Sequence, residues 1–353
     1  MLTEKDIEDL RKEIEEATRP MYLFDADGDG LSAFLQIYNV VKDGKGISIK
    51  KNFDFDEKFL ETINEFQPDK IFILDIPRID EDFLRKIKFK IVWVDHHEPI
   101  DFKLSNLKYF NPTKNDKSLY YPTSAICYDS LKKDLWLAVV GCIYDGYIPK
   151  YLSEFSEKYP EILYDSKISM LEIKYDSKLG DLVQIFEFLL KGKSADYKKN
   201  INILTRIQSP DEIIEQKTPA AKFLHKYYKK IKKDYDQLLT RASKARSEDG
   251  ILAFIYPHDN YSFTSEIANR LAYYHPDDIV IVGREKAGQI FMSIRSYKYD
   301  LRELLKIVFS KIEGYGGGHI AAVGASVNKE LYKDFLELIK SNLNLVEIKN
   351  KNS

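Results

Sequence analysis

At 353 residues, the chain exceeds the usual size of a single domain, so we expect two domains. Its 44% hydrophobic content excludes a disordered protein, and its net charge of −2 gives no global argument for a nucleic-acid partner. The two cysteines, Cys127 and Cys142, provide neither a disulfide framework nor the spacing of a zinc site. The first residues lack signal-peptide character and no apolar run is long enough to cross a bilayer, so we expect a cytoplasmic protein with no membrane partner.

Short apolar runs alternate with helical patterns over the first 150 residues, after an amphipathic helix at 1–19. Alternation of this kind predicts βαβ units and a parallel sheet. The expected strands are 21–24, 47–49, 71–74 and 91–94, and the expected helices are 31–41, 57–65, 81–87, 122–131 and 135–144.

The chain changes character after residue 150, where a polar helical region leads into a long helix expected at 220–246. A second α/β unit begins near Gly250. Its expected strands are 251–256, 278–282 and 289–295, and its expected helices are 264–273, 300–309 and 329–341. We therefore expect an N-terminal parallel-sheet domain at 1–150, a helical linker at 151–248, a smaller α/β domain at 249–347 and a tail at 348–353.

Three of the expected strands run directly into acidic residues. Strand 21–24 is followed by Asp25, Asp27 and Asp29, strand 71–74 by Asp75, and strand 91–94 by Asp95, His96 and His97. Because ligands sit beyond the carboxyl ends of parallel strands, these side chains are expected to converge on one crevice. Crowded carboxylates do not all stay ionised without cations, and oxygen plus imidazole donors suit Mn²⁺ or a similar divalent ion. The pattern predicts a metal-dependent enzyme acting on phosphate.

Two acidic segments, one of them after a helix, also have simpler interpretations. The segment from Asp25 to Gly30 matches the start of an EF-hand loop, although its twelfth position is Gln36 and a strand precedes it; a calcium loop and a plain acidic turn are the alternatives. Asp145 ends the helix at 135–144, where an acid opposes the helix dipole, so we expect a metal there; a turn residue before Gly146 is the alternative.

The second unit carries a glycine run, Gly316-Gly317-Gly318, followed by His319. The run is either a tight turn or a backbone that approaches a phosphate closely, with Arg295 as a bidentate partner. The basic stretch at 222–246 is either the solvated face of a long helix or a wall that follows a phosphate backbone.

These motifs, in this order, resemble the DHH/DHHA1 phosphoesterase superfamily, and within it the archaeal RecJ-like exonucleases. Asp27-x-Asp29-Gly30, Asp75, Asp95-His96-His97 and Asp145 match the four motifs of the DHH domain, while 291–296 and the glycine–His motif match the smaller DHHA1 domain. The resemblance implies an α/β chain with an N-terminal parallel-sheet DHH domain, a helical linker and a C-terminal α/β DHHA1 domain.

The resemblance also implies hydrolysis of phosphodiester bonds with two Mn²⁺ ions, or Mg²⁺. The implied metal ligands are Asp25, Asp27, Asp29, Asp75, His96 and Asp145. The implied catalytic residues are Asp95, His97, Arg295 and His319, with Asp95 orienting His96. The implied substrate-binding residues are Arg295, Gly316, Gly317, Gly318 and His319.

One position departs from the family pattern. The family usually has a metal-binding histidine two or four residues before the first acid of motif one, where this chain has Asp25 and Leu23. Either Asp25 takes over that role, or one metal is held more weakly.

The implied substrate is single-stranded DNA or RNA, cleaved from one end to 5′-mononucleotides, with replication or repair proteins as further partners. The alternative activities are hydrolysis of short oligonucleotides, as in a nanoRNase, or of cyclic dinucleotides. A non-enzymatic alternative is a scaffold in a replication or repair complex.

Overall fold

The computed structural model describes residues 2–50, 53–114, 116, 119–257 and 261–348, so the expected tail lies outside it except for Ile348. The chain separates into two compact units, Met1–Tyr228 and Lys229–Ser353, with the boundary inside one long helix. The division into 1–150, 151–248 and 249–347 stays a prediction.

The first unit is built on a five-stranded parallel sheet in the order β2-β1-β3-β4-β5. The strands are β1 (Met21–Asp25), β2 (Lys45–Ile49), β3 (Lys70–Leu74), β4 (Lys90–Val94) and β5 (Leu107–Phe110). The central strands β1, β3 and β4 are apolar runs buried on both faces, as parallel strands covered by helices require. The expected parallel sheet is confirmed; β5, which has a polar exposed residue at Lys108, was not predicted.

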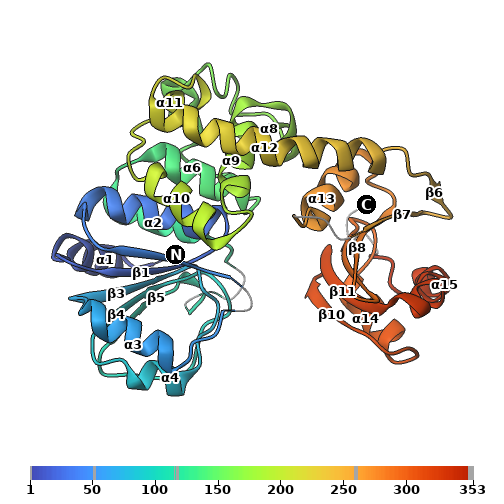
Figure 1. Cartoon of the computed structure of the whole chain (residues 1–353), viewed down its shortest axis with the longest axis horizontal. Coiled ribbons are helices and arrows are strands. Elements are labelled where there is room, and N and C mark those ends of the chain that lie inside the picture. Colours follow the sequence, from blue (N-terminus) through green and yellow to red (C-terminus); the bar gives the residue numbers. More distant parts are fainter. Residues whose placement is uncertain (1, 51–52, 115, 117–118, 258–260, 349–353) are drawn as a thin grey trace. The chain divides into compact units, whose positions relative to one another are not determined.

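Helices cover both faces of this sheet (Figure 1). One face carries α3 (Glu57–Phe66) and α4 (Glu81–Lys86), which bury an apolar core against the strands. The other carries α2 (Gly28–Val41), α5 (Thr123–Leu131) and α6 (Leu135–Tyr144), which pack on one another. The remaining helices are α1 (Glu4–Glu15), α7 (Leu152–Lys158), α8 (Met170–Asp176), α9 (Lys178–Leu189), α10 (Ser194–Leu204) and α11 (Pro210–Ile214).

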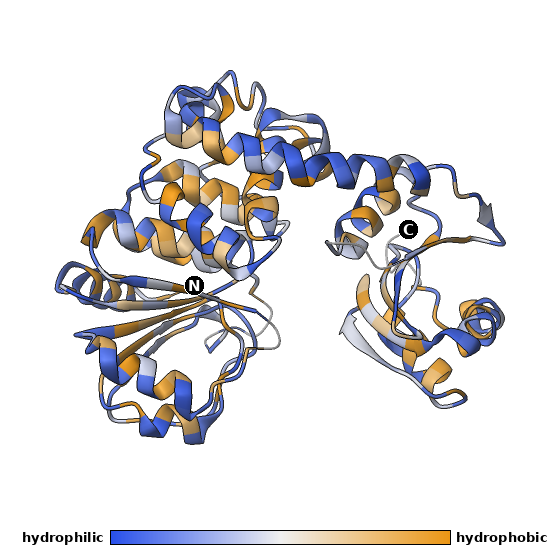
Figure 2. Ribbon diagram, viewed as in Figure 1, coloured by the Kyte–Doolittle hydropathy of each residue, from blue (hydrophilic) through white to orange (hydrophobic). Residues whose placement is uncertain are grey.

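Helix starts in this unit are fixed by short polar side chains. Thr3 forms a capping box with Asp6 at α1, and Asp56 and Asp80 cap α3 and α4 by accepting backbone N–H bonds. Hydrophobic residues are concentrated where these helices meet the sheet (Figure 2). The long helix α12 (Pro219–Ala242) follows.

The second unit has a six-stranded mixed sheet in the order β10-β11-β9-β8-β7-β6. The strands are β6 (Ser247–Glu248), β7 (Ile251–Pro257), β8 (Ile279–Lys286), β9 (Gln289–Arg295), β10 (Tyr315–His319) and β11 (Ala322–Asn328). Helices α14 (Leu301–Phe309) and α15 (Tyr332–Asn342) bury the main core of this unit against the sheet, and α13 (Thr264–Tyr274) contacts β8 and β9.

The glycine run is the largest difference from the expected elements. It forms β10, an edge strand paired antiparallel with β11, rather than a tight turn. Among helices of the described residues, none combines the length and apolar character needed to span a bilayer.

Candidate metal centre

The sheet of the first unit places its acidic strand ends around one point. The strand order reverses direction between β1 and β3, because β2 lies on one side of β1 and β3 and β4 on the other. At such a switch point the connections leave in opposite directions and open a crevice beyond the strand ends. Asp25 ends β1, and Asp75 directly follows β3. The crevice is therefore lined by carboxylates from its two flanking strands.

Asp27 and Asp29 are positioned by the start of α2. Asp27 is the N-cap, and its Oδ1 accepts a hydrogen bond from the Gly30 N–H at 2.9 Å. A Cβ on Gly30 would lie 2.6 Å from the backbone oxygen of Asp25, so glycine is required where the helix start packs on the end of β1. The segment is thus a strand-to-helix turn, unlike the helix-flanked calcium loop of an EF-hand.

Asp29 joins α2 to α5. Its buried carboxylate accepts hydrogen bonds from the backbone N–H groups of Thr123 (2.7 Å) and Ser124 (3.0 Å) at the start of α5. A Cβ on Gly141 would lie 2.9 Å from Asp29 Oδ1 and 2.4 Å from Ser124 Oγ, so α6 approaches closely only because it has a glycine there. Three helices therefore meet at this carboxylate.

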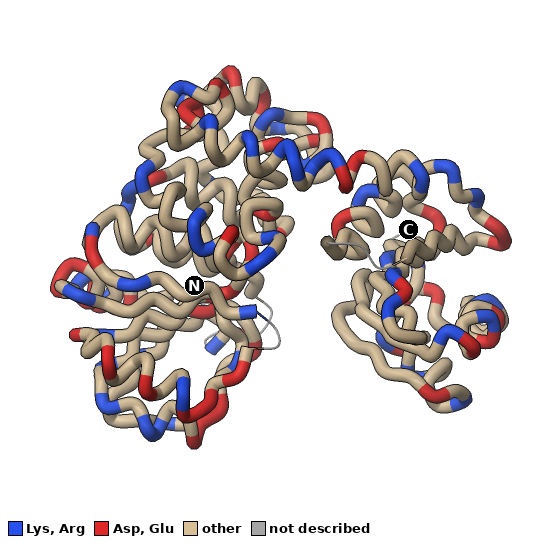
Figure 3. Tube along the Cα trace, viewed as in Figure 1, with Lys and Arg blue, Asp and Glu red and all other residues tan. Residues whose placement is uncertain are grey.

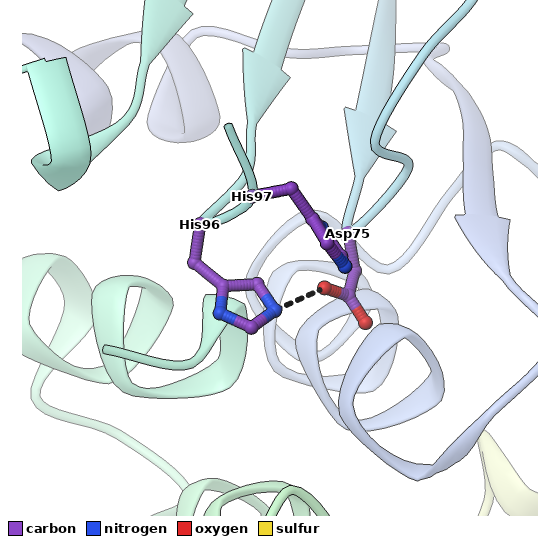
Figure 4. A group of neighbouring side chains, drawn as sticks. All are labelled: Asp75, His96 and His97. Atoms are coloured by element: carbon purple, nitrogen blue, oxygen red, sulfur yellow. Dashed lines mark ion pairs between the residues drawn. The ribbon is translucent and has the colours of Figure 1, made fainter. Parts of the chain in front are cut away.

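Asp75 has an unusual backbone conformation. Its φ is +60°, in the left-handed region that few side chains adopt, and its side chain is buried. Its Oδ1 accepts a hydrogen bond from the Thr123 hydroxyl (3.1 Å) and lies 3.2 Å from His96 Nε2 (Figure 4). Strain of this kind persists where the surrounding structure holds a side chain in a functional position.

His96 bridges two of the predicted ligands. Its Nε2 lies 3.2 Å from Asp75 Oδ1 and 3.5 Å from Oδ2 of Asp145, the residue that caps the end of α6 as expected. Both His96 Nδ1 and Asp145 Oδ2 are buried without a hydrogen-bond partner among the described residues. Buried polar atoms without partners are costly, so an ion beside Asp145 Oδ2 would account for that oxygen better than packing does.

Asp95 contacts His97 rather than His96, which corrects the expectation from the sequence. His97 Nδ1 lies 2.8 Å from Asp95 Oδ1, and the His97 N–H donates to Asp95 Oδ2 at 3.1 Å. The two histidine rings are 4.4 Å apart and do not point to opposite sides, because β4 ends at Val94 and strand alternation does not extend to them.

Two further residues that the sequence did not single out fix this arrangement. Asn111 Nδ2 donates to Asp95 Oδ2 (3.2 Å) and to the His97 carbonyl (3.0 Å), and the Tyr109 hydroxyl donates to Asp95 (3.4 Å). Both lie in or just after β5. The signal that could have found Asn111 is Asn-Pro following a fifth strand in the same sheet.

The predicted ligand atoms form three overlapping groups. Within each group, donor atoms lie within 4.8 Å of one another, in the sets Asp25–Asp27–Asp75, Asp29–His96–Asp145 and Asp75–His96–His97. All six predicted ligands are therefore brought together, with His97 beside them, and Asp75 and His96 are shared between groups.

Charge crowding shapes the electrostatics of this cluster. Burial, reinforced by the charges of Asp25 and Asp29, raises the pKa of Asp27 to about 8. Burial and the charge of Asp29 raise the pKa of Asp75 and of Asp145 well above their usual range. Burial lowers the pKa of His96, which favours the neutral imidazole that binds metals. Buried carboxylates and a neutral imidazole fit divalent ions such as Mn²⁺ and Mg²⁺.

Replacing Asp25 by asparagine tests its expected role as the substitute for the usual histidine. We expect weaker metal binding and a higher Mn²⁺ concentration for half-maximal activity, because one charged ligand is lost from the β1 side. Mn²⁺ titration of activity and of intrinsic tyrosine fluorescence measures this. Asp25→His is the matched variant, since it offers the more usual imidazole; an unchanged titration in Asp25→Asn would leave Asp27 and Asp29 as the ligands on that side.

The predicted residues of the second unit lie on its sheet. Arg295 ends β9, where its Nε donates to Asn269 (2.6 Å) and an Nη donates to Ser265 (2.8 Å), both on α13. In the strand register, His319 pairs with Ala322, which pairs with Arg295. His319 and Arg295 therefore share one cross-strand row with a small residue between them.

The three glycines of β10 lie in different surroundings. A Cβ on Gly316 would lie 2.8 Å from Leu305 Cδ1, so this glycine allows α14 to pack on the strand. A Cβ on Gly317 would meet nothing within 4 Å, so its side of the strand is open. Gly318 has a φ of +145°, which requires glycine.

Comparison with known proteins finds one matching family model and several similar folds. Residues 252–345 match the family model of the DHHA1 domain. The fold is similar to RecJ from Thermus thermophilus in complex with Mn²⁺ (TM-score 0.68, 16% identity, 98% of this chain and 55% of that chain). It is also similar to an exonuclease RecJ bound to manganese (TM-score 0.63, 15% identity, 97% of this chain and 95% of that chain). A third similar structure is a pGpG-specific phosphodiesterase from Vibrio cholerae (TM-score 0.51, 13% identity, 93% of this chain and 99% of that chain).

One relative found by sequence matches only part of the chain. The alanine–tRNA ligase of Mycoplasma mobile is 26% identical over 171 residues, which are 46% of this chain and 18% of the ligase. The chain thus spans under a fifth of that ligase and about half of the Thermus RecJ. Residues 252–345 therefore match the DHHA1 domain family, and the fold of the chain is similar to that of the RecJ structures.

Proposed function

We propose that the chain is a metal-dependent phosphodiesterase that degrades single-stranded DNA or RNA from one end, releasing 5′-mononucleotides, as a member of the archaeal RecJ-like branch. The observation that carries this proposal is the convergence of Asp25, Asp27, Asp29, Asp75, His96 and Asp145 at the switch point of the parallel sheet. Divalent ions held there would polarise a phosphoryl oxygen and activate water for in-line attack.

Residues of each unit would bind phosphate groups of the substrate. Burial alone would lower the pKa of His97, but its hydrogen bond to Asp95 raises it, so the imidazole keeps a proton to donate to a phosphate oxygen. Arg295 offers a planar guanidinium already held by α13, which reduces the entropy lost on binding a phosphate. His319 adds a second donor from the same row of the sheet.

The decisive experiment uses single-stranded DNA and RNA, each labelled at either end, with Mn²⁺, Mg²⁺ or EDTA. We expect metal-dependent release of mononucleotides from one end of one or both polymers. Internal cuts would contradict an exonuclease. No hydrolysis of any substrate with either metal would favour the scaffold alternative, in which replication or repair proteins are the partners.

A second candidate, a hydrolase of dinucleotides or very short oligonucleotides, is favoured by the likeness to the pGpG-specific phosphodiesterase, which aligns over nearly its whole length. Oligomers of two to thirty nucleotides separate the two. Cleavage confined to the shortest oligomers would favour this candidate, whereas turnover of all lengths would favour the exonuclease.

His319→Ala tests whether the second unit holds substrate. We expect metal content to remain intact, because His319 lies outside the acidic cluster, while kcat/KM for nucleotide substrates falls by roughly 10²-fold, the scale of losing one positioned donor. The activated ester bis-p-nitrophenyl phosphate should be affected less, since it has no nucleotide to hold. Lys311→Ala, an exposed residue of the same unit, is the control. An equal loss on both substrates would contradict a role confined to substrate binding.

A further inference from the structure

The long helix α12 carries an unusual distribution of positive charge. Five of its lysines are exposed, and none of their side chains forms an ion pair or hydrogen bond with another described residue. They are Lys222, Lys226, Lys229, Lys230 and Lys233. We call this set the lysine stripe. Figure 3 shows positive residues recurring along this helix.

The five lysines share one side of the helix. At about 100° per residue they fall within an arc of roughly 100°, and successive lysines are about 1.5–6 Å apart along the axis. The buried residues Leu224, Tyr228, Ile231, Tyr235 and Leu238 occupy the opposite side. The apolar side accounts for the packing of α12, so the lysine stripe is not needed to fix the helix in the protein.

Some exposed lysines of other helices are paired with acids. Lys12 in α1 pairs with Glu16, and Lys306 in α14 pairs with Glu303. Within α12 itself, Lys232 lies off the stripe, is less exposed and pairs with Asp236 at 2.7 Å. Like charges three or four residues apart on a helix repel one another, so an unpaired stripe weakens the helix. A polyanion that neutralises the stripe would remove that repulsion.

We propose that the lysine stripe binds the phosphate backbone of single-stranded nucleic acid, outside the residues that act on the cleaved bond. This inference rests on the proposed function for the identity of the polymer. A flexible single strand can place successive phosphates along a straight row of cations, and flexible lysines contact phosphates without reading bases. The stripe therefore contributes affinity for long strands, independent of sequence, and contributes nothing to a dinucleotide, whose single phosphodiester would be held at the metal centre.

The test is binding of labelled oligothymidylates to the full chain in EDTA, where no turnover occurs, over a series of salt concentrations. In the triple variant Lys226→Gln, Lys230→Gln, Lys233→Gln, we expect weaker binding of a thirty-nucleotide strand. The slope of log affinity against log salt should become shallower by roughly 2, since each contact with a single strand contributes about 0.7. Cleavage of a dinucleotide in Mn²⁺ should be unchanged.

A matched control removes the same charge elsewhere. Lys5→Gln, Lys12→Gln, Lys58→Gln changes three exposed lysines of α1 and α3 and should leave the slope as in the wild type. Thermal melting confirms that both variants are folded. Equal slopes in the stripe variant and the wild type, equal losses in both triple variants, or no binding by the wild type would each overturn the inference. Because binding is measured without turnover, an inactive protein that still shows the slope change would contradict only the proposed hydrolysis.

Discussion

Replacing Asp75 by asparagine is expected to lower phosphodiester hydrolysis by at least about 10³-fold, the scale of losing a main electrostatic contribution. Asp75 belongs to two of the three groups of donor atoms, so its loss weakens both. Asparagine is the suitable replacement because it tolerates the left-handed φ of +60° and keeps the shape of the side chain. Hydrolysis near the wild-type rate in metal-supplemented buffer would rule out Asp75 as a shared ligand.

The same substitution should stabilise the metal-free protein. Burial and neighbouring acids raise the pKa of Asp75, so removing its charge relieves repulsion that the metal-free fold otherwise bears. We expect a gain of about 0.5–2 kcal/mol in the free energy of unfolding in EDTA, and a smaller increase in melting temperature on adding Mn²⁺ than in the wild type. Glu61→Gln, an exposed acid of α3, should change neither quantity. A loss of stability in EDTA would contradict the account of charge crowding.

Much of the candidate metal centre could be predicted because its residues follow a simple local pattern. Strands such as 71–74 are apolar runs long enough to recognise, and each ends in an acid that the parallel sheet brings to one edge. The prediction that Asp95 orients His96 was wrong, because the hydrogen bonds of Asp95 depend on the coil after Val94, where no periodic pattern applies.

Two strands that depend on tertiary contacts, β5 and β10, were not predicted from the sequence. Glycine has little intrinsic preference for strands, so the sequence predicted either a tight turn or a backbone that approaches a phosphate, and no strand. Gly316 lies in a strand because β11 pairs with it and Leu305 of α14 packs where a side chain would be. Likewise β5 lacks an apolar pattern, with Lys108 in its middle, and is defined by pairing with β4.

A buried charge cluster at the other end of the sheet was also invisible in the sequence. Glu13 of α1 is almost completely buried and is bound by three lysines, Lys70 (3.0 Å), Lys90 (2.5 Å) and Lys108 (2.7 Å). These lysines lie at the start of β3, at the start of β4 and in β5. They are separated in sequence and converge only because the strands are parallel and in register.

Glu13→Gln is expected to destabilise the protein by about 3 kcal/mol, because removing one partner of a buried ion pair leaves Lys70 buried with its charge uncompensated. Glu16→Gln is the matched control: its pair with Lys12 is exposed and spans 3.9 Å, so we expect a change of under about 0.5 kcal/mol. Urea unfolding of both variants at neutral pH measures the difference. Similar stabilities in the two variants would mean that the Glu13 cluster contributes no more than a surface pair.

The contribution of Glu13 should also depend on pH in a defined direction. Burial tends to raise the pKa of Glu13, but hydrogen bonds from Lys108, Lys90 and Lys70 outweigh it and lower the pKa from 4.5 to about 2. A lowered pKa in the folded state means that the stabilisation is complete above about 4.5 and is lost as the pH falls toward 2. The stability gap between the wild type and Glu13→Gln should therefore be constant from pH 7 to 5 and narrow below pH 4.5. A gap that widens on acidification would contradict this assignment. Because the lysines lie at the amino ends of the strands and the metal centre beyond their carboxyl ends, hydrolysis per folded molecule should be unchanged.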